Sequence, residues 1–104
     1  MTTFDDRQKG YEAKFAQDEA LRFKATARRN RLLGQWAAGL LGLTGAAADD
    51  YAKTVVKSDF EKPGDEDVVA KVAGDLKGKA SEAEVRAKLD GLMSEAVAQI
   101  EAGA

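Results

Sequence analysis

A run of basic side chains is the first feature of this 104-residue sequence that could do chemistry. Five cations occur within ten residues, with no acidic side chain among them: Arg22, Lys24, Arg28, Arg29 and Arg31. Guanidinium groups form forked hydrogen bonds with phosphates and carboxylates, so the run could bind a nucleotide, a nucleic acid or an acidic protein surface. The whole chain is acidic, however, with a net charge of −2. The commoner explanation is a solvent-exposed helix face whose positive charge complements the negative charge of the acidic C-terminal half. Nucleic acid is not the expected partner.

The sequence offers little for catalysis or metal binding. It contains no Cys and no His, which excludes thiolate nucleophiles, disulfides, imidazole bases and histidine-based pH switches. The spacing of its acidic residues differs from that of a calcium-binding EF-hand loop, and no glycine-rich phosphate loop is present. We therefore expect a protein that is not an enzyme, with no metal site and no cofactor. Weak nucleotide binding by the arginines at 28, 29 and 31 stays open.

Three aromatic side chains stand in a short, charge-rich stretch near the start of the chain, FDDRQKGYEAKF at 4–15. On a helix that turns about 100° per residue, Phe4, Tyr11 and Phe15 fall within about 20° of one line. Gly10 interrupts this pattern at a cost of about 1 kcal/mol relative to Ala, and isolated helices of this length are marginal in water. The segment either docks on its own domain, folds on a partner or is a frayed terminus.

Apolar residues at intervals of three and four predict an all-α protein, and nothing in the sequence is typical of a strand. Four helices are expected, over about 19–41, 45–60, 66–77 and 82–101. Short connections between amphipathic helices indicate a four-helix bundle over 19–104. A segment at 1–18, disordered or partly helical when free, precedes it. The longest apolar run, 32–43, is too short for a membrane span of about 20 residues, and no signal peptide is apparent.

Local signals predict several helix ends and faces. Ser81 and Glu84 have the spacing of a capping box, Asp65 and Thr44 are expected N-caps, and Gly42 is expected to end the first helix. The stripe expected to be buried on the first helix is Leu21, Ala25, Arg28, Leu32, Trp36 and Leu40, widened by Leu33, Ala37 and Leu41.

Several strings of residues resemble one known family from end to end. They are FDDRQKGYEAKFAQDEALRFKATARRNRLLGQWAA at 4–38, LGLTG at 41–45, YAKTVVKSDFEKPGDEDVVAKV at 51–72 and EAVAQIEA at 95–102. On these strings the chain resembles the alphaproteobacterial F1Fo-ATP synthase inhibitor zeta-subunit family, formerly a domain family of unknown function. FKATARRNRLLGQWAA and DFEKPGDEDV are the most specific strings, and residues 74–90 are the loosest part.

The resemblance implies a four-helix bundle with a mobile N-terminal region that becomes helical on binding the F1 head of the ATP synthase. In the family this region wedges at a catalytic α/β interface next to γ, which blocks ATP hydrolysis and its direction of rotation while synthesis continues. The residues implied in this contact are Phe4, Asp5, Asp6, Arg7, Gln8, Lys9, Tyr11, Glu12, Lys14 and Phe15.

The cationic set would then make a secondary contact or bind nucleotide weakly; it consists of Arg22, Lys24, Arg28, Arg29 and Arg31. We expect a cytoplasmic protein that is a monomer when free, does not insert into the membrane, and is peripheral to the inner membrane through the ATP synthase. The alternative is a helical module that binds nucleotide or nucleic acid through residues 22–31.

Overall fold

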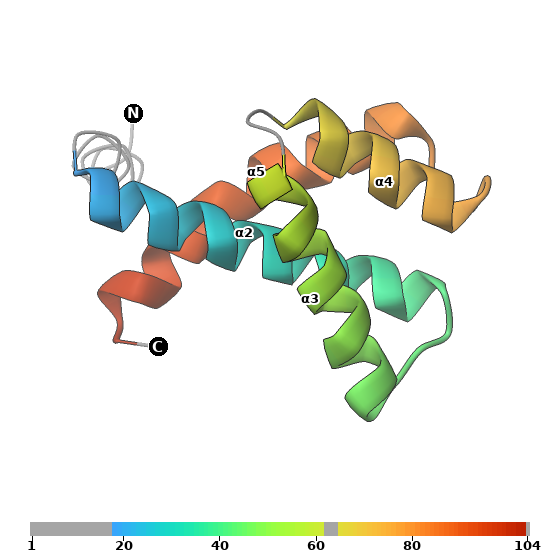
Figure 1. The fold of residues 1–104 in the computed structure, drawn as a ribbon, viewed down its shortest axis with the longest axis horizontal. Coiled ribbons are helices and arrows are strands. Elements are labelled where there is room, and N and C mark those ends of the chain that lie inside the picture. The colour runs from blue at the N-terminus through green and yellow to red at the C-terminus, as the bar shows by residue number, and fades with distance from the viewer. Residues whose placement is uncertain (1–17, 62–64, 104) are drawn as a thin grey trace, which may run out of the picture.

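The computed structural model describes residues 18–61 and 65–103, and this part of the chain forms four α-helices and no strand (Figure 1). The helices are α2 (Glu19–Leu40), α3 (Gly45–Glu61), α4 (Glu66–Leu76) and α5 (Glu82–Glu101). The all-α class and the helical bundle are confirmed, and each observed helix end lies within one residue of the expected one. The division into an inhibitory segment at 1–18 and a bundle at 19–104 stays a prediction.

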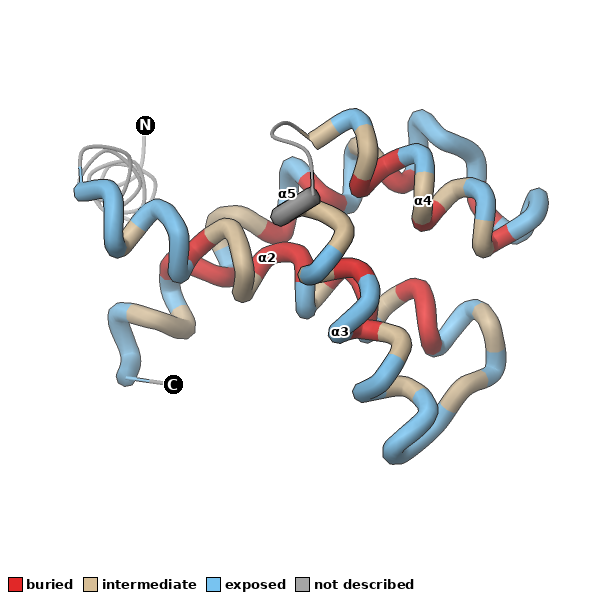
Figure 2. Tube along the Cα trace, viewed as in Figure 1, coloured by how far each residue is buried: buried red, intermediate tan, exposed pale blue. Residues whose placement is uncertain are grey.

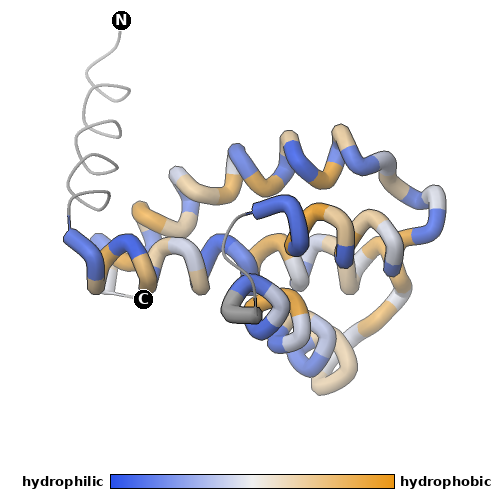
Figure 3. Tube along the Cα trace, turned by 45° about the horizontal axis from the view of Figure 1, so that its top comes forward, coloured by the Kyte–Doolittle hydropathy of each residue, from blue (hydrophilic) through white to orange (hydrophobic). Residues whose placement is uncertain are grey.

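α2 is the central helix and contacts each of the other three. The start of α2 and the end of α5 lie at the same end of the molecule, whereas α4 packs at the opposite end (Figure 1). Figure 2 shows that buried residues concentrate along α2, α4 and α5 where these helices meet, and Figure 3 shows hydrophobic and hydrophilic residues alternating in bands along them. No helix in the described part of the chain is long and apolar enough to cross a membrane.

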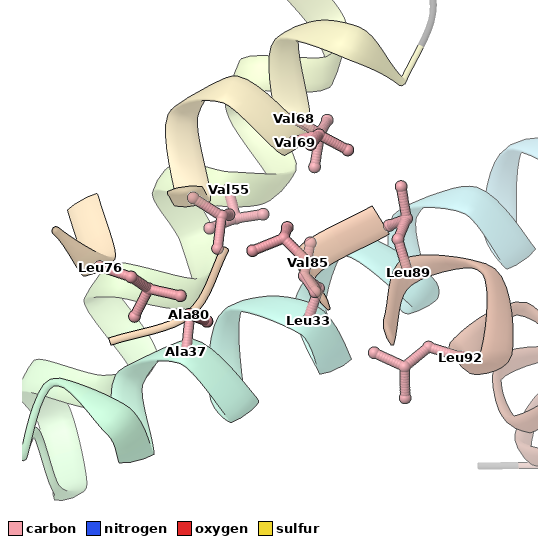
Figure 4. Packing of buried hydrophobic residues seen from close by; sticks show 11 residues of the cluster. Leu33, Ala37, Val55, Val68, Val69, Leu76, Ala80, Val85, Leu89 and Leu92 are labelled. Carbon is pink, nitrogen blue, oxygen red and sulfur yellow. The ribbon is translucent and has the colours of Figure 1, made fainter. Parts of the chain in front are cut away.

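Aliphatic side chains from all four helices form the main core (Figure 4). The buried apolar residues of α4 and of the first half of α5 all lie here. Burying one such side chain contributes about 1.5–3 kcal/mol, which makes this cluster the chief source of stability. Its buried members are Leu33, Ala37, Val55, Val68, Val69, Val72, Leu76, Ala80, Val85, Leu89 and Leu92.

The buried face of α2 differs from the expected stripe. Leu40 is 38% exposed, and Leu32 and Trp36 are half-buried. The buried residues of this helix are Ala25, Arg29, Asn30, Leu33, Gly34, Ala37 and Ala38. Most of these residues are small, because the helices that pack on α2 approach its backbone closely. Larger side chains are displaced toward the edges of the contact.

The ends of α2 and α5 follow the expected local signals. The Asp18 carboxylate accepts a hydrogen bond from Leu21 N at 3.1 Å and so caps α2. Gly42 takes φ 78 just after α2, and its N–H donates to the Gly39 carbonyl at 3.2 Å, as in a Schellman end. The expected capping box at Ser81 is present, with both of its hydrogen bonds formed.

The two expected N-caps of α3 and α4 depart from the geometry that local signals predict. Asp65 occupies the N-cap position of α4, but its carboxylate makes no capping bond and instead accepts hydrogen bonds from Arg29. The stronger attraction of a buried guanidinium explains this preference. α3 begins at Gly45 with φ 56, a left-handed conformation outside ordinary capping geometry. Thr44 contributes its backbone carbonyl, which accepts from Ala48 N at 3.4 Å.

Candidate functional site

The ten residues expected to contact F1 lie within 4–15, outside the described residues. What the structure supplies is their point of attachment. Asp18, the N-cap of α2, is exposed at the end of the molecule where α5 also ends. The segment therefore joins the bundle at one end of its central helix.

A pocket of about 1020 Å³ opens between α2, α3 and the end of α5. Three cations of the expected set line it: Lys24, Arg28 and Arg31. α3 adds Lys53 and Lys57, which the sequence reasoning did not include. Their spacing of four residues places both on one face of α3, but the sequence alone does not show that this face turns toward α2. The pocket thus gathers five cations from two helices.

The remaining walls of this pocket are largely apolar. Ala27, Val56 and Ile100 line it from three different helices. Phe23 also lines it and is 59% exposed. Among the described residues that line the pocket, only Asp49 is acidic. The chemistry fits an anionic ligand that also has an apolar or aromatic part.

Arg28 is held between α2 and α5. Its Nη1 donates to Gln99 Oε1 at 3.2 Å, and Gln99 Nε2 donates to Glu95 Oε1 at 3.3 Å. Arg22 belongs to a different surface, a smaller pocket of about 320 Å³ that Glu19 and Asp59 also line. Four members of the expected cationic set are therefore divided between two pockets.

Arg29 faces the interior of the bundle. It is 6% exposed, and its Nη2 lies 2.8 Å from Asp65 Oδ1. Nε and Nη2 also donate to Asn30 Oδ1, at 3.2 and 3.1 Å. Asn30 Nδ2 in turn donates to Asp59 Oδ2 at 3.0 Å. This network of four side chains joins α2 to the end of α3 and the start of α4, so Arg29 has a structural role and is separate from the pocket.

A second polar cluster joins α3 to α4. The Tyr51 hydroxyl donates to Asp75 Oδ2 at 2.8 Å, and Lys71 Nζ lies 2.9 Å from the same oxygen and 5.4 Å from the centroid of the Tyr51 ring. Burial, and then the Asp75 carboxylate, raise the pKa of Tyr51 well above its ordinary value. Burial opposes ionisation of Asp75, but hydrogen bonds from Lys71 and Tyr51 outweigh it and hold the pKa of Asp75 below its ordinary value.

In the cluster at Tyr51 the hydroxyl lies beside the Asp75 carboxylate, but the raised pKa of Tyr51 disfavours the phenolate that a covalent mechanism would need. Across residues 18–61 and 65–103, no group of three or more acidic side chains is placed to hold a metal ion. The larger pocket, lined by Lys24, Arg28, Arg31, Lys53 and Lys57, is called the basic pocket below. Of the features that the structure describes, it is the best suited to binding a ligand.

Comparison with known proteins identifies the family. The family model described as ATPase inhibitor subunit zeta matches residues 1–99. A solved structure titled "Solution NMR structure of the protein" is 56% identical over 81% of this chain and 99% of that chain, with a TM-score of 0.76. No curated protein matches the chain. Because the family match spans both the N-terminal segment and the four helices, the chain belongs to the ATPase inhibitor subunit zeta family.

Proposed function

We propose that this protein inhibits the F1-ATPase by inserting residues 4–15, as a helix, at a catalytic α/β interface near γ. The insertion blocks ATP hydrolysis and its direction of rotation and leaves synthesis possible, because hydrolysis closes the interface on the wedge and synthesis opens it. The observation that carries the proposal is the family match over residues 1–99. The aromatic stripe of the segment supports it, since such a stripe needs a surface on which to be buried.

The energetics suit a segment that folds on its partner. Burying Phe4, Tyr11 and Phe15 gives roughly 5–9 kcal/mol at about 1.5–3 kcal/mol each. Ordering the segment opposes this by about 2–5 kcal/mol. The aromatics alone therefore give modest affinity. Charged neighbours, among them Asp5, Arg7 and Lys14, supply the remaining contacts and the specificity.

The bundle acts as a body that carries the segment. The described clusters of buried apolar residues draw all their members from residues 21–100. α2 also has its own N-cap at Asp18. Removing residues 1–17 should therefore leave these clusters and the cap in place.

Deletion of residues 1–17 tests the proposal directly. We expect the truncated protein to keep its melting temperature and to lose inhibition of ATP hydrolysis by F1. In the full-length chain, Phe4→Ala combined with Phe15→Ala should weaken inhibition without lowering the melting temperature. Equal inhibition by the truncated protein would contradict the proposal that residues 4–15 act as the wedge. A loss of stability in the double variant would mean that the aromatics dock on the bundle.

We also propose a second function for the bundle, the binding of a nucleotide in the basic pocket. The composition of the pocket supports this. Its cations, such as Arg28 and Lys53, suit phosphates, and its apolar walls suit a base. The pocket faces solvent, so the affinity expected is weak.

Calorimetric titration with ADP and ATP tests the second function. Lys53→Glu with Lys57→Glu should abolish binding, because the changes place two anions beside the phosphates. Lys77→Glu with Lys79→Glu is the matched control, since both lysines are exposed and neither is among the lining residues. Equal loss in the two variants would show that net charge, rather than the pocket, governs binding. Tighter binding of DNA than of nucleotide would favour a module that binds nucleic acid instead.

A further inference from the structure

We propose that the basic pocket is a clamp that an anion closes: a nucleotide bound there joins α3 to the start of α2 and the end of α5, and it keeps the first turns of α2 from opening. The inference rests on the proposed nucleotide binding and adds its consequence for the bundle. It follows from the helices that line the pocket, from the small apolar contact that holds this end together, and from the charges around the pocket.

The walls of the basic pocket come from parts of the chain that are far apart in sequence. The first turns of α2 contribute Phe23, Lys24 and Ala27. The end of α5 contributes Ile100, and Gly103 follows it. α3 supplies a further wall, on the face that carries its two lysines. A ligand that fills the pocket therefore contacts three helices at once.

Little apolar contact holds this end of the bundle together. A small cluster joins the start of α2 to the end of α5, and its members are Leu21, Ala25, Met93, Val97 and Ile100. α3 contributes no described residue to this cluster. Opening of the first turns of α2 therefore exposes little apolar surface, and it takes their side chains away from the pocket. A bound ligand supplies the link to α3 that the cluster lacks.

The charges around the pocket oppose closure of this end when no anion is bound. Its lysines form no ion pair with any residue that the structure describes: Lys24, Lys53 and Lys57. Two arginines add to this positive charge, whereas Asp49 is the only acid among the described lining residues. Like charges on the walls of one pocket repel, and salt screens them with a Debye length of about 10 Å at 0.1 M. The phosphates of a nucleotide replace this repulsion between α2 and α3 by attraction to a common ligand.

Hydrogen exchange with a nucleotide tests the clamp on the full-length chain. Opened turns lack the complete pocket, so ADP at about ten times its dissociation constant should slow exchange of the amides of residues 23–27 by about tenfold. Amides of residues 74–76, in the last turn of α4 at the opposite end of the molecule, should be unaffected, because their local opening leaves the pocket intact (Figure 1). Adenosine, which has no phosphate, should change neither group. Sodium chloride keeps the ionic strength of all samples equal.

The outcomes separate the clamp from the nucleotide binding on which it rests. Unchanged exchange of residues 23–27, in samples where calorimetry shows bound ADP, would overturn the clamp and leave nucleotide binding standing. Equal slowing by adenosine and by ADP would overturn the role of the phosphates, and the clamp with it. Absence of ADP binding would remove both the second function and this inference.

Charge neutralisation tests the same device without a ligand. Lys53→Gln combined with Lys57→Gln removes two cations from the α3 wall. At low salt we expect this variant to exchange the amides of residues 23–27 about two- to fivefold more slowly than the wild type, because less repulsion opposes closure. ADP should then slow this exchange no further.

Lys77→Gln combined with Lys79→Gln is the matched control for this variant. It changes the net charge equally, and both lysines are exposed and lie outside the described lining of the pocket. We expect the exchange of residues 23–27 in the control to equal that of the wild type. Equal slowing in the two variants, or faster exchange after the changes at 53 and 57, would overturn the proposal.

Discussion

Two glycines of α2 differ in what surrounds them. A Cβ at Gly34 would lie 2.6 Å from the Ala52 Cα and 3.0 Å from its Cβ, whereas a Cβ at Gly39 meets nothing within 4 Å. Gly34 is therefore the point at which α3 crosses against the backbone of α2. Gly39 has no such contact and carries only the entropic cost of glycine in a helix.

The two glycines form a matched pair for mutation. Gly34→Ala should lower the free energy of unfolding by about 1–3 kcal/mol, because the Ala52 backbone must move away. Gly39→Ala should raise it by up to about 1 kcal/mol through helix propensity. Urea unfolding monitored by circular dichroism measures both. Stabilisation by Gly34→Ala would mean that the two helices separate more easily than this contact implies.

Asp65 and Glu66 are adjacent acids with different partners. Asp65 neutralises the buried Arg29, whereas Glu66 pairs with the exposed Arg86 at 2.8 Å. Asp65→Ala leaves a buried guanidinium without its carboxylate and should cost about 1–3 kcal/mol, below the figure for a fully buried pair because the Asp65 side chain is 45% exposed. Glu66→Ala should change stability little, since exposed pairs are screened by solvent. Thermal unfolding of both variants makes the comparison, and equal effects would contradict the role given to Arg29.

At the scale of elements, the sequence predicts helices better than it predicts their faces. The stripes of α4 and α5 are clear because they consist of Val and Leu, whose burial is favourable in almost any bundle. The buried face of α2 is predicted only in part: Ala25, Leu33 and Ala37 are buried as expected, but small residues such as Gly34 and Ala38 also lie there. Alanine and glycine suit both a surface and a close helix crossing, so only the position of α3 distinguishes the two.

The candidate site shows the same limit. Spacing identifies the cations of α2 but not their division between two pockets, nor the removal of Arg29 into the core. Its partner Asp65 lies 36 residues away along the chain, and local signals there favour an N-cap. Contacts between distant segments depend on how the helices pack, which one sequence does not reveal.

The α3–α4 joint should respond to alkaline pH through Tyr51. Its pKa is raised above the ordinary value of 10.0, so the folded state favours the neutral phenol. The resulting stability is fully present below about pH 10 and is lost as pH rises toward the folded-state pKa. The stability difference between the wild type and Tyr51→Phe should therefore narrow above pH 10. Urea unfolding at several alkaline pH values measures this difference. A difference in the free energy of unfolding that stays constant above pH 10 would contradict the role given to Tyr51.

Asp75 provides the acidic counterpart of that prediction. Its pKa lies below the ordinary value of 3.8, so its contribution is present above about pH 4 and is lost as pH falls through the folded-state pKa. The difference in the free energy of unfolding between the wild type and Asp75→Asn should narrow as pH falls below about 4. A difference that stays constant over the acidic range would contradict the assignment.

At the scale of the whole molecule, apolar burial is unevenly distributed. The main core joins all four helices, whereas a small separate cluster joins the start of α2 to the end of α5. The small cluster has two buried members, Ala25 and Val97, with three half-buried side chains beside them. The end of the bundle at which α2 begins is therefore its less stable end.

Native-state hydrogen exchange should show this gradient. We expect backbone amides of residues 23–27 in α2 to exchange faster than those of residues 31–38, because opening the first turns exposes little apolar surface. Resolved amide exchange by NMR measures both groups in one sample. Met93→Ala should widen the difference in exchange rate between the two groups, since Met93 packs in the small cluster. Leu89→Ala should accelerate the exchange of both groups, since Leu89 belongs to the main core. Uniform protection along α2 would show that the bundle opens as one unit.

The buried network of Arg29 and Asn30 also limits which arrangements of helices are possible. α2 carries many small residues on its buried face, and helices with small, smooth contact faces can pack at several offsets with similar energies. A guanidinium and an amide that are both buried have hydrogen-bond partners only when the ends of α3 and α4 stand in one position. Any other offset leaves them unpaired and is disfavoured. The network thus selects one register for the helices, and with it one fixed direction in which the central helix leaves the bundle.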